Sequence, residues 1–345
     1  MRVAYLVHQY FPRHVGGTEI YVRGLARRAR ARGHDVLIIT YHESPSPDVS
    51  GFGICHTRVD DIPVAEIHYN LSVAPRPARY EYDNPWVADR AEEELDRFTP
   101  DVVHAAHAMK LSGAVLERCQ QRGWPVLVTL SDYWFLCPRH TLLKWNDDLC
   151  QGPKDPRYCR RCLTETHGFA SFDIAREGWS PRALTRSIIR LAHDSQDIGH
   201  RQDYLLRVLN DCQQIVALSD FMKSLMTAYG VPADRIEVLP HGPELEGVTV
   251  NRAEPARPVS VAFIGSLSTH KGVHLLIEAL KRRPDLDVRL KLYGAIRKGD
   301  AYVDRLLADS RNDPRIHWMG TFPVESLGQV LSGTDLLALP ALWYE

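Results

Sequence analysis

Residues 3–40 read VAYLVHQYFPRHVGGTEIYVRGLARRARARGHDVLIIT, and this stretch decides the fold that we predict. Residues 3–8 are almost continuously apolar, as expected for a parallel strand that is buried on both faces. Paired glycines at 16 and 17 precede a helical pattern over residues 20–32, and residues 36–40 form a second apolar run. Strand, glycine turn, helix and strand in this order are typical of a parallel βαβ unit.

The alternation of strand and helix patterns continues along the chain and predicts an α/β fold with parallel sheets. Residues 43–63 interrupt it with Ser, Pro, Gly and Asp and are predicted to be loop, while a strand is predicted near residues 66–70. A polar, proline-containing stretch begins at residue 243, and the pattern restarts after residue 258. We therefore expect two Rossmann-like, doubly wound domains that face each other across a cleft.

The length of 345 residues is enough for two domains. We place the N-terminal domain at residues 1–242, with a cysteine-rich insertion at about 131–180, and the C-terminal domain at residues 243–345. The sequence ends at Glu345 directly after an apolar, strand-like run, whereas natural chains usually end on a polar segment. This ending predicts that the second domain is truncated.

Composition excludes several classes of protein. Lys and Arg number 42 and Asp and Glu number 43, so the chain is neither a basic nucleic-acid coat nor an acidic tail protein. Hydrophobic residues make up 44%, which is ordinary for a globular protein. No apolar run approaches the roughly 20 residues of a membrane helix, and the N-terminus lacks the features of a secretory signal. We therefore predict a cytoplasmic protein whose cysteines stay reduced.

Two glycine loops are candidates for anion binding. Gly16 and Gly17 precede a helix N-terminus, which offers unpaired N–H groups and the positive end of the helix dipole. Gly265 follows another predicted strand, and Lys271 could contact a phosphate as a point charge. The alternative is that both loops are tight turns that need glycine. Because each loop follows the first strand of its own domain, the two could hold an anionic ligand between them.

The motifs of the chain, taken in order, resemble those of a known family. They are Gly16-Gly17-Thr18-Glu19, Ser219-Asp220-Phe221-Met222-Lys223, Pro240-His241-Gly242, Gly265 with Lys271-Gly272, and Leu339-Pro340-Ala341-Leu342-Trp343-Tyr344-Glu345. Together they resemble the retaining glycosyltransferases of family 4, which have the GT-B fold of two Rossmann-like domains. The likeness runs over essentially the whole chain, and the order and placement of the motifs make it specific.

This resemblance implies a UDP- or GDP-sugar donor bound mainly by the second domain. A glycan, lipid-linked or small-molecule acceptor would bind mainly to the first. Lys271 would neutralise the donor diphosphate beside Gly265, and Gly16 and Gly17 would approach its phosphates. Glu345 would be the first glutamate of the family's E-x7-E motif, next to the sugar, and no catalytic metal is expected. The resemblance also implies polysaccharide biosynthesis and peripheral contact with the inner face of a membrane.

In this family a histidine after the fourth strand lies near the donor sugar. The chain offers His104 and His107, and we favour His107 because it lies past the strand's C-terminal end, where ligands bind in such sheets. His104 lies within the strand and is predicted to pack in the core. The chain departs from the family at Ser266, where arginine is frequent, and at Ser131, where histidine usually precedes the aspartate at Asp132.

Two other functions stay open at the level of sequence. A sugar-nucleotide epimerase of the same two-domain architecture would use a similar donor site but would convert the donor without an acceptor. An inactive, truncated fragment is the second alternative, because the second glutamate of the motif would lie beyond Glu345.

Cys137, Cys150, Cys159 and Cys162 lie within one irregular segment. The last two form a C-x-x-C pair, and four thiolates suit tetrahedral zinc. Such a metal would be structural, since four protein ligands leave no open position, and it could order a segment that has little apolar periodicity. The alternatives are an iron–sulfur cluster, for which the spacing gives no support, and free thiols that pack in some other way.

Two further groups of side chains are less specific. Tyr133-Trp134-Phe135 follows the fifth predicted strand and either lines an acceptor pocket or forms core beneath the cysteine segment. Cys55, Cys119 and Cys212 are expected to be ordinary packed residues. No basic stripe interleaved with aromatic residues indicates nucleic-acid binding.

Overall fold

The computed structural model describes residues 1–44, 52–153, 155–167, 181–242, 248–250 and 257–344. The chain divides into two compact units: Met1–Trp145 with Cys150–Glu244, and Asn146–Leu149 with Leu245–Glu345. Each unit has its own sheet and its own hydrophobic core. Within the described ranges, no helix combines the length and the apolar character that crossing a membrane would require.

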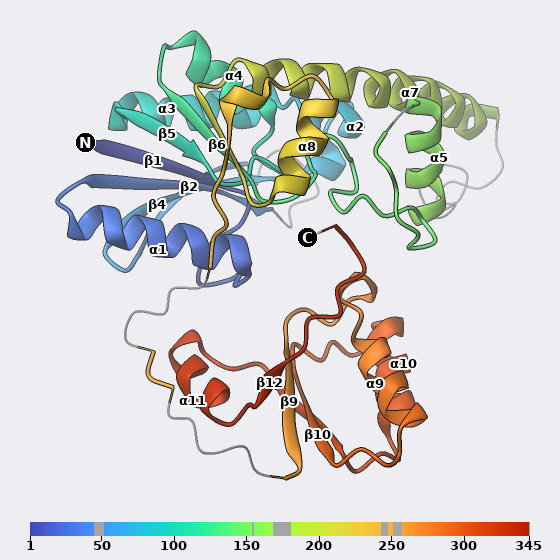
Figure 1. Ribbon diagram of the computed structural model, residues 1–345. Helices are drawn as coiled ribbons and strands as arrows, with labels where there is room; N and C mark the ends of the chain where they lie inside the picture. The colour runs from blue at the N-terminus through green and yellow to red at the C-terminus, as the bar shows by residue number, and fades with distance from the viewer. Residues whose placement is uncertain (45–51, 154, 168–180, 243–247, 251–256, 345) are drawn as a thin grey trace. The chain divides into compact units, whose positions relative to one another are not determined.

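The first unit is built on an eight-stranded sheet with the order β3-β4-β2-β1-β5-β6-β7-β8 (Figure 1). Its strands are β1 (Arg2–Val7), β2 (Asp35–Glu43), β3 (Gly53–Val59), β4 (Ile62–Tyr69), β5 (Val102–Ala105), β6 (Val126–Leu130), β7 (Gln214–Ala217) and β8 (Ile236–Val238). Only β3 and β4 pair in antiparallel fashion among these strands. The direction of strand addition reverses between β1 and β5, and ligands bind at such a reversal in doubly wound sheets.

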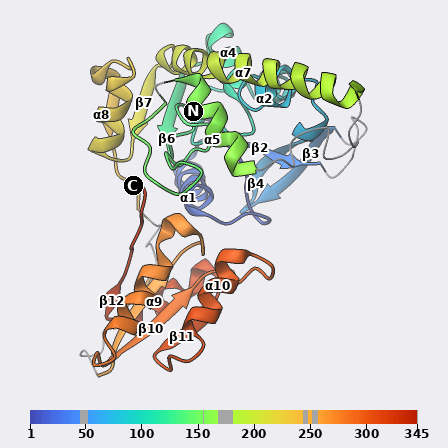
Figure 2. The same cartoon turned by 90° about the vertical axis from the view of Figure 1, so that its right-hand side faces the viewer.

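Helices cover both faces of this first sheet. Helix α1 (Gly17–Ala31) lies on one face, while α3 (Pro85–Phe98), α4 (Gly113–Gln121) and α7 (Pro181–Asn210) lie on the opposite face (Figure 1). The short α2 (Pro77–Tyr80) contacts α7, α5 (Pro156–His167) also packs on α7, and α8 (Asp220–Ala228) flanks β7 and β8 (Figure 2).

Helix starts in this unit are set by side-chain caps and proline. The Asn84 side chain accepts a hydrogen bond from the Val87 N–H, and Pro85 occupies the first position of α3. The Ser219 hydroxyl accepts in the same way from the Met222 N–H at the start of α8. These caps satisfy N–H groups that have no partner within the helix.

The main departure from the predicted fold lies at residues 53–59, which we expected to be loop and which form strand β3. Asp60 and Asp61 have φ angles of 51° and 59° and close a two-residue turn between β3 and β4. Two successive left-handed residues are the geometry of a type I′ hairpin. The predicted strand near residues 66–70 is the end of β4, which begins earlier, at Ile62.

The second unit contains a four-stranded, fully parallel sheet with the order β11-β10-β9-β12. Its strands are β9 (Val259–Ile264), β10 (Val288–Tyr293), β11 (Ile316–Gly320) and β12 (Leu336–Leu337). Its helices are α9 (Val273–Arg282), α10 (Ala301–Ser310) and α11 (Leu327–Ser332).

One apolar core holds the second unit together. Phe263 and Leu292, from neighbouring strands, pack against Ile277 of α9 and Leu306 of α10, and all four side chains are at most 2% exposed. This burial fixes where β9 ends, and therefore where the loop that follows it begins.

Candidate functional site

Three polar side chains gather where β1, β5 and β6 end. His8 follows β1, His107 comes two residues after β5, and Asp132 comes two residues after β6. Because the three strands are parallel neighbours, their C-terminal ends lie at one edge of the sheet. This is the edge at which doubly wound sheets bind ligands.

His107 is held at both of its ring nitrogens. Its Nε2 lies 2.9 Å from Oδ2 of Asp132, and its Nδ1 accepts a hydrogen bond of 3.1 Å from the Met109 N–H. Since Nδ1 accepts, Nε2 carries a ring proton and donates a hydrogen bond to Asp132. Burial would raise the pKa of Asp132, but the charge and hydrogen bond of His107 outweigh it, and that pKa is lowered.

His8 stacks on His107, with 4.3 Å between the ring centroids. Burial, followed by the nearby charge of His107, lowers the pKa of His8 to about 2, so its ring is neutral. The Nδ1 atom of His8 is buried and makes no hydrogen bond. A buried polar atom without a partner is uncommon in proteins, and this one could bond to a ligand.

The glycine loop is shaped by Glu19, which is only 4% exposed. Burial raises the pKa of Glu19, and the nearby backbone amides of Glu19 and Gly16 oppose that rise. A Cβ atom at Gly16 would lie 2.6 Å from Oε2 of Glu19, whereas one at Gly17 would meet nothing within 4 Å. A side chain at Gly16 would therefore force the buried Glu19 carboxylate to shift, whereas Gly17 leaves open space at the first turn of α1.

His104 lies within β5, and its Nε2 is 2.8 Å from the Thr129 hydroxyl. Burial lowers its pKa to about 4. His104 lies within the strand, as expected, but it is only partly buried. For Tyr133-Trp134-Phe135, the structure supports a place in the core over a place in a pocket. Trp134 is 1% exposed, and its Nε1–H donates to Glu81 at 2.6 Å.

In the second unit, the loop after β9 packs against the motif near the chain's end. Lys271 lies with its Nζ 4.8 Å from the centre of the Trp343 ring, and the Leu342 N–H donates to the His270 carbonyl at 2.8 Å. Gly272 has φ +70°, and a Cβ there would lie 2.0 Å from the Pro340 carbonyl oxygen. The structure thus brings these two motifs together.

Gly265 directly follows β9, and its N–H donates to the Tyr293 carbonyl at 3.0 Å. A Cβ at Gly265 would lie 3.2 Å from the Phe263 ring, which is tight but not prohibitive. Glu345, the remaining site residue predicted in this unit, lies outside the described residues.

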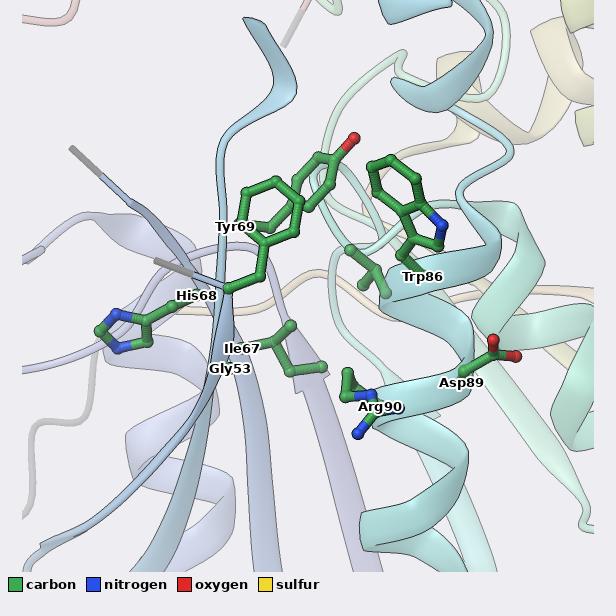
Figure 3. A pocket seen from close by; sticks show the side chains of 9 residues that line it. Gly53, Ile67, His68, Tyr69, Trp86, Asp89 and Arg90 are labelled. Carbon is green, nitrogen blue, oxygen red and sulfur yellow. The ribbon is translucent and has the colours of Figure 1, made fainter. Parts of the chain in front are cut away.

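An aromatic cavity of about 320 Å³ lies at the end of β4 and the start of α3, and the sequence alone did not predict it (Figure 3). Trp86 and Tyr69 project from these two elements, with ring centroids 5.8 Å apart, and Phe52 lies 4.7 Å from Tyr69. Asp89 and Arg90 of α3 also line the cavity. Its residues come from three separate segments, so the only sequence signal was an aromatic residue at each.

Cys137, Cys150, Cys159 and Cys162 line one small apolar cavity. Burial, followed by the other three thiols, raises the pKa of Cys159 to about 12. In the described part of the chain, no group of three or more His, Cys, Asp or Glu side chains is preformed to hold a metal ion. The expectation that Cys55 packs in the interior is wrong, because Cys55 is exposed on β3.

Comparison with known proteins connects the chain to one family. A family model described as Glycosyltransferase Family 4 matches residues 15–246. A D-inositol 3-phosphate glycosyltransferase from Nocardia farcinica is 28% identical over 166 residues, which are 43% of this chain and 35% of that protein. One from Pseudarthrobacter chlorophenolicus is 21% identical over 350 residues, covering 94% of this chain and 69% of that protein.

An uncharacterised 42.6 kDa protein from the cps region of Klebsiella pneumoniae is 26% identical over 143 residues, or 39% of this chain. The matched region spans little more than a third of these two relatives: 38% of the Klebsiella protein and 35% of the Nocardia protein.

Solved structures share the fold. Sucrose-phosphate synthase from Thermosynechococcus elongatus has a TM-score of 0.60 at 14% identity, over 99% of this chain and 75% of that chain. HepE from Anabaena, in complex with UDP, has a TM-score of 0.59 at 17% identity, over 99% of this chain and 74% of that chain. These likenesses confirm the expected α/β class with parallel, Rossmann-like sheets.

Proposed function

Because the chain belongs to glycosyltransferase family 4, we propose that it transfers a sugar from a nucleotide-sugar donor to an acceptor with retention of configuration. The family match over residues 15–246 is the observation that carries this proposal. The HepE structure that shares the fold holds UDP, which supports a UDP- or GDP-sugar as the donor. The acceptor is a glycan, a lipid-linked sugar or a small molecule, as in polysaccharide biosynthesis.

The second unit supplies the site for the donor diphosphate in this proposal. Lys271 ends the short helical turn Thr269–Lys271, and Gly265 begins the same loop. The Lys271 ammonium would neutralise the charge that develops on the leaving diphosphate, which is electrostatic catalysis. Contact with the Trp343 ring orients this lysine, and Glu345 would stand beside the donor sugar.

The first unit supplies the surroundings of the reacting sugar. The open space at Gly17 would let a donor phosphate approach the positive N-terminus of α1. His107 would contact the sugar, and Asp132 would act as a positioning residue, because its carboxylate accepts a hydrogen bond from Nε2–H and fixes the ring. The buried, unpartnered Nδ1 of His8 supplies a further polar atom at this edge of the sheet.

The aromatic cavity beside α3 suits a sugar-containing acceptor. Trp86 offers an indole ring on which the apolar face of a sugar can stack, and Arg90 lines the same cavity with a group that can donate hydrogen bonds. Concave sites of about 300–1,000 Å³ with aromatic walls and few polar groups are common ligand sites. We assign this cavity to the acceptor.

Product analysis with and without acceptor tests the proposal against a sugar-nucleotide epimerase. The purified chain is incubated with a panel of UDP- and GDP-sugars, and the nucleoside diphosphate and sugar products are separated and quantified. We expect nucleoside diphosphate to be released only when an acceptor is present. Conversion of the donor sugar in the absence of acceptor would instead identify an epimerase and overturn the proposal.

A further inference from the structure

Four thiols from distant parts of the cysteine-rich segment meet around one cavity. Cys137 and Cys150 lie in irregular backbone, whereas Cys159 and Cys162 lie one helical turn apart on α5. All four line the same small cavity, whose other walls are largely apolar. Four cysteines around one apolar cavity supply the donor set that structural zinc takes in proteins.

Backbone hydrogen bonds hold two of the cysteines beside this cavity. The Cys137 carbonyl accepts a bond of 2.8 Å from the His140 N–H, and the Leu142 carbonyl accepts one of 2.7 Å from the Cys150 N–H. Leu142 has a left-handed conformation, with φ 52°, and its side chain is completely buried. These bonds fix the loop that carries Cys137 and Cys150 against the cavity wall.

A buried arginine provides charge for the same cluster. Arg201 is 3% exposed, and its Nε donates to Glu81 at 3.0 Å while its Nη2 donates to the Trp134 carbonyl at 2.7 Å. Its Nη1 is buried and has no hydrogen-bond partner. Its positive charge acts on the thiols of Cys137 and Cys159. A buried positive charge that acts on these thiols would favour a negatively charged thiolate cluster.

We propose that Cys137, Cys150, Cys159 and Cys162 bind one structural zinc ion. In forming the site, four thiols release four protons to solvent and four Zn–S bonds form, so the cluster carries two net negative charges without any change in oxidation state. No ligand group is preformed in the described residues, so the proposal requires the four sulfurs to approach one another when the ion binds. The four-sulfur shell has no open position, so the zinc orders this segment and takes no part in transfer chemistry.

Elemental analysis of the purified, reduced chain tests this proposal. We expect about one zinc ion per chain after gel filtration. The double variant Cys159→Ser/Cys162→Ser should hold at least tenfold less. The matched control is Cys55→Ser, which removes an exposed thiol far from the cavity in sequence and should keep its zinc. Zinc bound equally by the double variant, or iron in its place, overturns the proposal.

A second measurement on the unaltered chain separates loss of metal from loss of fold. Titration with a mercurial thiol reagent should release the zinc in step with modification of the four thiols, and a chromogenic chelator reports the release. Chain loaded with Co²⁺ in place of zinc should show the visible absorption of a tetrahedral cobalt thiolate. Well-folded, reduced chain that binds neither zinc nor Co²⁺ contradicts the site.

Discussion

Gly16 and Gly17 are neighbours in sequence, yet the space around their Cα atoms differs. A methyl group at Gly16 would collide with Oε2 of Glu19, but one at Gly17 would extend into open space. We expect Gly16→Ala to lower the free energy of unfolding by about 1–3 kcal/mol, the usual range for overpacking. Denaturant unfolding of the purified variants measures this loss.

Gly17→Ala serves as the matched control. This substitution should leave stability unchanged or raise it by about 0.4–1 kcal/mol, because alanine restricts the unfolded chain. If Gly17 faces the donor phosphates, as proposed, the same variant should weaken nucleotide-sugar binding. Equal stability of the Gly16 variant and the original chain would refute the assigned contact with Glu19.

His8 makes stability depend on pH. Its pKa is about 2 in the fold, against 6.5 for an ordinary histidine, so the folded chain keeps it neutral. As the pH falls below the unfolded pKa, only the unfolded chain takes up this proton. The contribution of His8 to the free energy of unfolding is therefore fully present above about pH 6.5. It is lost as the pH falls, by up to about 1.4 kcal/mol per pH unit.

Urea unfolding at a series of pH values between about 7 and 5 follows this loss. The variant His8→Gln should show a shallower dependence, and His104→Gln should act in the same direction because burial also lowers that pKa. His317 is exposed on β11, so His317→Gln should leave the slope unchanged. An unchanged slope in the His8 variant would rule out its neutral, buried state.

At the scale of elements, the β3–β4 hairpin shows where local sequence was ambiguous. Asp60 and Asp61 are both left-handed, and Asp60 also forms a two-pronged ion pair with Arg23, with N–O distances of 2.6 and 2.8 Å. Asp61→Gly should raise the free energy of unfolding by about 1 kcal/mol, because glycine relieves left-handed strain. Thermal or urea unfolding detects this gain.

Asp60→Gly is the comparison for that prediction. It relieves similar backbone strain but removes the pair with Arg23, so its net gain should be smaller than that of Asp61→Gly. A larger gain from Asp60→Gly would mean that the ion pair does not stabilise the hairpin.

Most elements could be predicted because their apolar periodicity agrees with their place in the fold. The run at Val3–Val7 is buried on both faces of the sheet, so it carries no polar alternation that would confuse it with a loop. Strand β3 could not be recognised because it is an edge strand whose residues 55–58 are exposed. With few buried side chains, it lacks the pattern on which prediction relies.

At the scale of the whole molecule, sequence motifs located parts of the site whose geometry they could not give. The position of His107 past the end of β5 followed from the pattern, but its bonds to Asp132 and Met109 did not. The aromatic cavity was missed because Phe52, Tyr69 and Trp86 are brought together only by the packing of β4 against α3. Long-range contacts of this kind leave no periodic trace in the chain.

Each unit carries one part of the proposed chemistry. The first holds the pair of His107 with Asp132 and the aromatic cavity, and the second holds Lys271 against Trp343. The proposal that the chain is a glycosyltransferase requires both parts in one reaction. The variant Lys271→Ala removes only the positive charge at the proposed donor site, so it tests the glycosyltransferase proposal as a whole.

The most direct measurement is acceptor-dependent turnover of a nucleotide sugar by the unaltered chain, by Lys271→Ala and by Lys281→Ala. Lys281 is a matched lysine on α9 that pairs with Asp309 at 2.9 Å, and its removal should leave the rate unchanged. Loss of the Lys271 charge should lower kcat at least about 100-fold, corresponding to about 2.7 kcal/mol of transition-state stabilisation. Full turnover by Lys271→Ala, or donor conversion that needs no acceptor, would contradict the account.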